Sequence, residues 1–139
     1  MKYEFTGEVM QYNRHELKRI RRIEDGLLGG WIENEGNLPQ FGYCFVFDEA
    51  KVYERAIIFH NAKIYNNAVV SGSAMITGDA IISGSAAVYG NALILDNVVI
   101  TDNAKIKDDV VLHDNVIVYG NAVVDGTVTI GHDIEIYEE

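Results

Sequence analysis

The sequence predicts an all-β solenoid that fills about two thirds of the chain, preceded by a small N-terminal cap. Between Val46 and Ile136 an aliphatic residue recurs every six positions without a slip. Four residues after each of the first fifteen stands a small or branched apolar residue, which is Ala in ten cases. Self-similarity at a fixed short period is the signature of a solenoid, and a period of six fits neither an α-helix nor a simple hairpin.

Each six-residue unit, or hexad, is predicted to form a short strand followed by a tight corner. Hexad positions one and five have the same parity, so both side chains point to the same side of the strand. That side must be the interior, because these positions hold only aliphatic residues and Ala. Positions three and four are mostly Gly, Asn, Asp or Ser, which suit corners because Gly, Asn and Asp tolerate left-handed backbone angles.

Two of these hexads, Val88-Tyr-Gly-Asn-Ala-Leu and Val118-Tyr-Gly-Asn-Ala-Val, resemble the hexapeptide-repeat family, with its [LIV]-G-x-x-[STAV]-x motif. The resemblance implies a left-handed parallel β-helix with three hexads in each coil. The left hand comes from the resemblance alone, since the usual crossover rule favours the right hand. Fifteen complete hexads then make about five coils, and the resulting prism is about 24 Å long.

Residues 1–45 are out of phase with the repeat, so we divide the chain into a cap, 1–45, and a β-helix, 46–139. Residues 2–12 read as a strand, a turn and a second strand. Residues 16–25 suit either a short helix or an edge strand. A loop with Gly36-Asn37 and Pro39 follows. The first coil of a solenoid has an open core, and we expect Trp31, Ile32 and Leu38 to plug it.

The segment Leu28-Gly-Gly-Trp-Ile-Glu, followed by Asn37-Leu38 and an aromatic stretch from Tyr43 to Tyr53, carries a second resemblance. It is similar to a group of phage and bacterial β-helix proteins with "LGGWIE" before "VYGNA" repeats. Some members are labelled acetyltransferases on grounds of fold alone. The resemblance implies a phage or mobile-element origin and no established chemistry.

Composition narrows the classes of partner. The net charge of −10 argues against general nucleic-acid binding. The exception is a basic cluster that we consider as an anion-binding candidate, made of Arg14, Lys18, Arg19, Arg21 and Arg22. The single Cys44 fits a reducing compartment, and neither a signal peptide nor an apolar run of membrane-spanning length is visible, so we expect a cytoplasmic protein.

The residues before and after each position-one aliphatic point outward, and every third hexad shares a face. One of the three faces lacks charge apart from His113, and it is made of Ile57, Phe59, Met75, Thr77, Leu93, Leu95, Val111, His113 and Thr129. A contiguous apolar strip indicates an interface. We expect it to hold a homodimer or homotrimer. The alternatives are cover by the N-terminal segment and a site for another protein or a small ligand.

The histidines and the corner aspartates raise three kinds of chemistry. The family resemblance implies acyl transfer by an interface histidine, for which His113 is the candidate, although no loop insertion or C-terminal helix accompanies the hexads. His113 and His132 are one coil plus one position apart, but the three-histidine metal site of the γ-type carbonic anhydrases lacks a third member. An acidic corner column suits Ca²⁺ or plain corner hydrogen bonding, and consists of Asp79, Asp96, Asp114 and Asp133.

We therefore expect a non-catalytic scaffold or binding protein that self-associates through the apolar face. We expect no metal and no cofactor. The alternative is an acyltransferase-like enzyme with His113 as its base.

Overall fold

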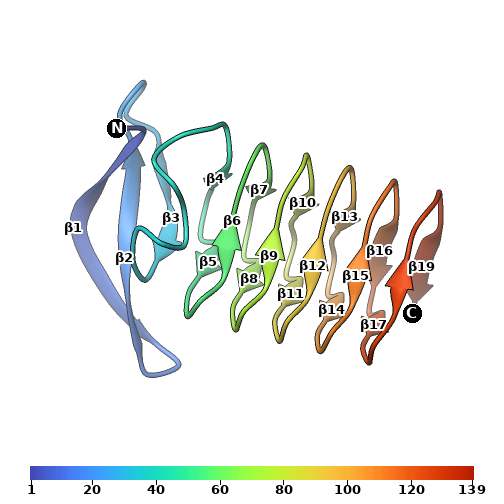
Figure 1. The fold of residues 1–139 in the computed structure, drawn as a ribbon. Helices are drawn as coiled ribbons and strands as arrows, with labels where there is room; N and C mark the ends of the chain where they lie inside the picture. Colours follow the sequence, from blue (N-terminus) through green and yellow to red (C-terminus); the bar gives the residue numbers. More distant parts are fainter.

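The computed structural model describes all of residues 1–139 and confirms the all-β solenoid. The chain forms no helix, so it has none that is long and apolar enough to cross a membrane. Short parallel strands stack into three sheets around one core, and the solenoid makes about six coils (Figure 1). This is one more than the five coils counted from complete hexads. The incomplete last hexad adds strand β19 (Glu135–Glu138), and the cap strand β3 (Leu28–Ile32) pairs in parallel with β5 (Lys51–Val52) at the other end.

The three sheets are numbered in the order in which the chain visits them from Lys51 onward. Sheet 1 contains β1 (Tyr3–Tyr12), β2 (His15–Arg22), β3 (Leu28–Ile32), β5 (Lys51–Val52), β8 (Val69–Val70), β11 (Ala87–Val88), β14 (Lys105–Ile106) and β17 (Val123–Val124). Sheet 2 contains β6 (Ile57–Ile58), β9 (Met75–Ile76), β12 (Leu93–Ile94), β15 (Val111–Leu112) and β18 (Thr129–Ile130). Sheet 3 contains β4 (Phe45–Val46), β7 (Lys63–Ile64), β10 (Ile81–Ile82), β13 (Val99–Ile100), β16 (Ile117–Gly120) and β19 (Glu135–Glu138).

Each solenoid strand pairs in parallel with the strand one coil later, so that position-one residues stack on one another. Ile82, for example, pairs with Ile64 on one side and with Ile100 on the other. These three side chains are fully buried, as is Ala86 at position five of its hexad. The parity rule therefore predicts the inward column correctly.

The corners depend on residues with left-handed backbone angles, whose side chains accept hydrogen bonds from amides of the next coil. Asn66 and Asp96 adopt φ angles of 59° and 54°. The Oδ1 atom of Asn66 accepts a hydrogen bond from the amide of Gly84, 18 residues later, at 3.0 Å. Asp96 Oδ2 does the same for the amide of Asp114 at 2.8 Å. Turn formers in the hexads thus both reverse the chain and satisfy backbone donors of the neighbouring coil.

The cap is an antiparallel extension of sheet 1. Strand β1 pairs with β2, β2 pairs with β3, and β3 joins β5 in parallel. Strand β1 is continuous over Tyr3–Tyr12 with a register irregularity between Phe5 and Val9, whereas the sequence predicts two strands and a turn over residues 2–12. The undecided stretch 16–25 is mainly strand β2, since it gains a partner on each edge.

The open core of the first coil is closed by side chains from several parts of the cap. Ile32 and Leu38 are fully buried in the main core, together with Tyr3, Ile20 and Phe45. The placement of Trp31 in this plug was wrong. Its indole lies on the outer side of sheet 1 in a separate cluster with Leu17 and Tyr53, because neighbouring strand residues point to opposite faces.

Candidate functional site

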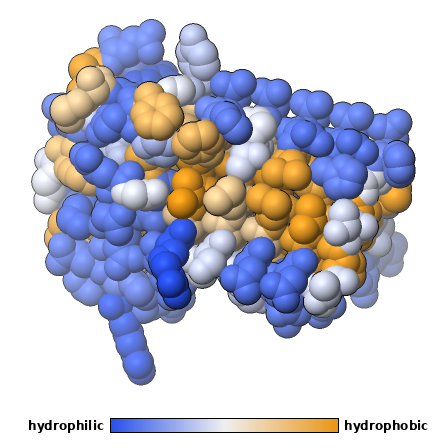
Figure 2. All heavy atoms as spheres, in the orientation of Figure 1, coloured by the Kyte–Doolittle hydropathy of each residue, from blue (hydrophilic) through white to orange (hydrophobic).

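The apolar face lies on the outer side of sheet 2. Its large side chains are Ile57, Phe59, Met75, Leu93, Leu95 and Val111, and this set keeps the name apolar face below. Met75 is 41% exposed, and the other five are partly exposed. They flank inward residues such as Ile58 and Ile94, which are fully buried, so strand parity fixes their outward direction. Figure 2 shows a run of hydrophobic residues over the strands of sheet 2 that lie at the front of Figure 1.

The N-terminal segment reaches this face only at its edge. Strands β1, β2 and β3 extend sheet 1 and lie at one end of the solenoid (Figure 1). From the loop before β4, Phe41 packs edge-on against Phe59, with ring centroids 5.8 Å apart. Phe41 is itself 66% exposed, so it lengthens the apolar surface. The alternative of cover by the cap is therefore restricted to the β6 end of the face.

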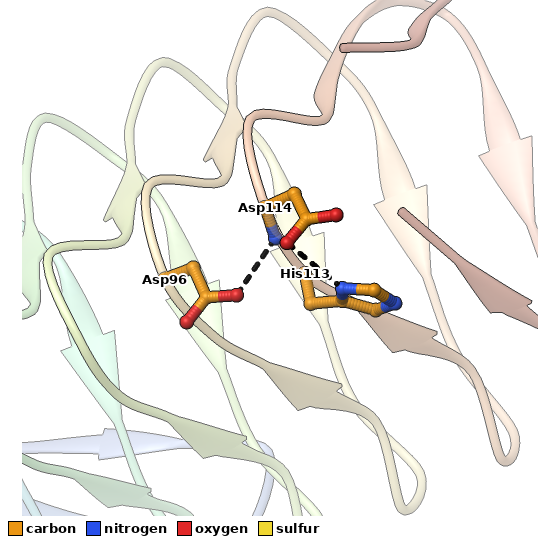
Figure 3. Close-up of side chains that lie close together, drawn as sticks. All are labelled: Asp96, His113 and Asp114. Atoms are coloured by element: carbon orange, nitrogen blue, oxygen red, sulfur yellow. Dashed lines mark hydrogen bonds and ion pairs between the residues drawn. The ribbon is translucent and has the colours of Figure 1, made fainter. Parts of the chain in front are cut away.

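His113 lies where the apolar face meets the corner between sheets 2 and 3. It follows the buried Leu112 of β15, and its side chain is 33% exposed. Its Nδ1 atom is 3.2 Å from Oδ1 of Asp114. Figure 3 marks this contact with a dashed line. The imidazole therefore turns toward the acidic corner column that the sequence defines.

Asp114 connects three successive coils at this corner. Its backbone amide donates to Oδ2 of Asp96 in the preceding coil, and its own Oδ2 accepts from the amide of His132 in the next, each at 2.8 Å. The ring atom Nδ1 of His132 lies 3.9 Å from the same Oδ2. The hydrogen bond from the His132 amide, followed by that from the His113 ring, lowers the pKa of Asp114 below its ordinary value.

The surface depression around Asp114, called the corner groove here, is lined by turn residues alone. They are Gly78, Asp79, Asp96, Asn97, Asp114, Asn115, His132 and Asp133. The groove has no Lys or Arg in its lining. The four aspartates of the sequence-defined column all line it, so that prediction of neighbours is confirmed. Ligand atoms of Asp96, His113 and Asp114 lie within 4.8 Å of one another.

The other histidines do not join this site. His60 occupies the same corner at the cap end of the solenoid, next to Phe59. His15 lies in β2, with Nδ1 2.9 Å from a carboxylate oxygen of Glu33. A three-histidine metal site is therefore not formed within the chain.

The basic cluster is divided between different contacts. Four of its five members already have partners within the chain. Lys18 donates a hydrogen bond to the backbone carbonyl of Glu33. The three arginines form ion pairs, Arg19 with Glu49, Arg21 with Glu4 and Arg22 with Asp25. Arg19 also lies over the ring of Trp31, with 4.9 Å between its guanidinium carbon and the ring centroid. Arg14 is exposed in the β1–β2 turn. Because strand β2 distributes these side chains to both faces, they do not converge on one anion site.

Comparison of the sequence with protein-family models and with curated proteins found no match.

Proposed function

We propose that this protein is a left-handed, hexapeptide-repeat β-helix that acts as a non-catalytic scaffold, self-associating through the apolar face into a dimer or trimer. The observation that carries the proposal is a partly exposed sheet face whose outward side chains include no Lys, Arg, Asp or Glu. Its large side chains are Ile57, Phe59, Met75, Leu93, Leu95 and Val111. Contiguous apolar surface of this kind is typical of protein interfaces.

The energetics favour association through many small gains. Full burial of a large aliphatic side chain stabilises by about 1.5–3 kcal/mol, and residues that are already partly buried contribute the lower part of that range or less. The face offers such side chains on four consecutive strands of sheet 2, β6 to β15, and a symmetric interface uses each of them twice. Their sum is comparable with the roughly 4–15 kcal/mol that association costs.

The same surface is shaped for face-to-face sheet packing. Four strands at about 4.8 Å spacing give a strip roughly 19 Å long, and stacked sheets lie about 10 Å apart. The side chains that border the strip are corner residues such as Asp79 and Asn91, which suit the polar rim of an interface.

The direct test is the solution mass of the wild type and of Leu93→Asp/Leu95→Asp by light scattering. We expect a dimer or trimer that becomes monomeric in the variant, because two carboxylates would be buried without partners. Ala87→Asp/Tyr89→Asp is the matched control, since it makes the same change beside Val88 in strand β11 of sheet 1. It should leave the mass unchanged.

A wild-type monomer at high micromolar concentration would exclude self-association. Loss of association in both variants would also count against this face, because the effect would then follow added negative charge rather than the surface altered. Circular dichroism on each variant checks that the solenoid itself is intact.

The second candidate is an acyltransferase-like enzyme that uses His113 as a general base. It is favoured by the contact between His113 Nδ1 and the carboxylate of Asp114, since a carboxylate in that position orients an imidazole and stabilises its charged form. Turnover of acetyl-CoA with amine and hydroxyl acceptors, abolished in His113→Ala, would support the enzyme. Absence of turnover in the wild type would count against the enzyme and favour the non-catalytic scaffold.

Origin and location are part of the proposal. The likeness of the Leu28–Glu33 segment to phage and bacterial β-helix proteins supports a phage or mobile-element source. The free, buried Cys44 supports a cytoplasmic location, because reducing compartments retain unpaired thiols. Beyond its own copies, the scaffold would bind another protein or a small ligand.

A further inference from the structure

Two features that the sequence presents separately meet at Asp114, in the lining of the corner groove. The sequence places an acidic column at the corner between sheets 2 and 3 and places His113 on the apolar face. In the structure the His113 ring lies over the next residue of its outward column, Gly131, and its Nδ1 atom also reaches Asp114 at the corner. Figure 3 shows the contact between His113 and Asp114. Nitrogen and carboxylate donors therefore lie together at one point.

A glycine in the next coil makes room for this orientation. Gly131 occupies the position that follows His113 in the same outward column. A Cβ atom at Gly131 would lie 2.6 Å from Nε2 and 2.9 Å from Nδ1 of the His113 ring, closer than real side chains approach. The imidazole is thus packed over bare backbone, in contact with both the corner and the sheet.

We propose that Asp96, His113 and Asp114 bind one divalent transition-metal ion of the zinc class. The ring of His132 from the following coil, which is 91% exposed, would turn in as the fourth ligand. Ligands at about 2.0–2.2 Å from a tetrahedral ion are about 3.4 Å apart. The separation between His113 Nδ1 and Asp114 Oδ1 is 3.2 Å, and that between His132 Nδ1 and Asp114 Oδ2 is 3.9 Å. The first separation is close to this spacing, and Asp96 offers an oxygen within 4.8 Å of that pair. The second is longer, and rotation of the exposed His132 side chain would shorten it.

The ligands are held by bonds that leave lone pairs for a metal. Asp96 and Asp114 each use Oδ2 to accept a backbone amide of the next coil, which fixes the orientation of the carboxylate. Asp96 Oδ1 remains available, and a carboxylate oxygen has a second lone pair. Outer-shell contacts of this kind orient metal ligands.

The donor set determines the class of ion. Ca²⁺ takes six to eight oxygen ligands, whereas imidazole suits zinc, nickel, copper and cobalt. Two carboxylates and two imidazoles leave a neutral site when Zn²⁺ binds. The nearby Asp79 and Asp133 add negative potential, and no cationic side chain lines the groove to oppose it.

The test is titration of ZnCl₂ into the purified full chain by calorimetry, with CaCl₂ as the competing class. We expect one Zn²⁺ per chain and an affinity that falls more than about tenfold in His113→Ala and in Asp114→Asn, since even second-shell changes cost about 10–100-fold. Asp114→Asn keeps the corner intact, because Asn66 already caps the amide of Gly84 in the same way. His60→Asn, at the far end of the same column, is the control and should bind as the wild type does.

A second readout assigns the site independently of affinity. Paramagnetic Co²⁺ should broaden the imidazole NMR signals of His113 and His132 and spare those of His15 and His60. The proposal is overturned if Zn²⁺ does not bind, if both ligand variants bind normally, if His60→Asn loses as much, or if Ca²⁺ binds equally well, which would make the acidic column alone responsible.

Discussion

At the scale of single residues, Asn37 is the buried polar side chain of the chain, at 1% exposure, and it joins the cap to the first coil. Its Oδ1 accepts from the amides of Glu33 and Asn34, and its Nδ2 donates to the carbonyls of Glu54 and Ala56. All its hydrogen-bonding groups are therefore used. The sequence marks Gly36-Asn37 only as a loop breaker, because composition cannot show which loop amide is enclosed.

Asn37→Ala should lower the free energy of unfolding by about 2–4 kcal/mol, because it leaves backbone groups buried without partners at a cost of about 1–3 kcal/mol each. Urea unfolding followed by circular dichroism measures the change. The control is Asn34→Ala, which removes one exposed hydrogen bond to Gly36 and should cost less than about 1 kcal/mol. Equal losses in the two variants would contradict the role given to Asn37.

The sequence pattern predicts the direction in which a side chain points better than it predicts the contacts of that side chain. Parity correctly sends Ile58 and Ile94 inward and Leu93 outward, since the period-two rule depends only on backbone geometry. The same rule cannot show that the His113 ring turns to Asp114, because that depends on the space left by Gly131 one coil away. Side-chain torsions and neighbours across 18 residues carry the missing information.

At the scale of elements, the packing of strand β2 explains why the sequence of residues 16–25 suits both a helix and a strand. Leu17 and Ile20 are three residues apart, a spacing that also suits one face of a helix. In a strand, residues with odd separation point to opposite faces. Leu17 packs in the outer cluster with Trp31, whereas Ile20 joins the main core, so both faces of β2 are buried. A helix would place Leu17 and Ile20 on one face and in one apolar cluster. The two residues lie in separate clusters on opposite faces, so the helix alternative is wrong.

Strand β3 crosses the end of the solenoid on two buried glycines. A Cβ at Gly30 would lie 2.5 Å from the carbonyl oxygen of Ala50 and 2.8 Å from Cγ1 of Val46. A Cβ at Gly29 would lie 2.8 Å from Cγ1 of Ile20. The Gly-Gly pair in the Leu28–Glu33 segment thus has a steric reason, which is the close approach of the cap to the first coil.

Gly30→Ala should therefore lower the free energy of unfolding by about 1–3 kcal/mol, as overpacking of a tight core does. Chemical unfolding measures the total effect, and hydrogen exchange of the β3 amides locates it. Gly36→Ala provides the comparison, since its Cβ would meet chiefly the flexible, exposed side chain of Asn34. If both glycines tolerate alanine equally, the close approach does not constrain β3.

At the scale of the whole molecule, a six-residue period determines the core but leaves the faces to the order of the hexads. We expect that a hexad can occupy any of the three sheets, because every complete hexad carries an aliphatic residue at position one and a small or branched apolar residue at position five. The apolar face exists since its outward residues recur every 18 positions, the length of one coil. The solenoid was predictable from this repetition, whereas the cap, which has no period, was predictable only as a plug of undefined shape.

Because the core and the apolar face depend on different features of the sequence, a deletion can keep the fold and interrupt the face. Two deletions make the comparison possible. Deletion of residues 61–78 removes one complete coil and joins His60 to Asp79, a corner pair that the chain already uses at His132-Asp133. Every later strand stays in its sheet. The shortened protein should fold and still associate, because it retains five of the six large side chains of the apolar face.

Deletion of residues 79–90 removes two hexads and joins Gly78 to Asn91, a Gly-Asn corner as at Gly120-Asn121. The core should again form, since each remaining hexad keeps its inward residues and stability in solenoids is set by neighbouring repeats. Strands β12 and β15 would, however, move to sheet 3, and β14 would bring Lys105 and Lys107 beside Met75 on sheet 2. Light scattering should therefore show weakened association although fewer residues are lost. Association equal to that of the wild type would exclude the continuous strip as the interface, and failure of this variant to fold would show that the hexads are not interchangeable between sheets.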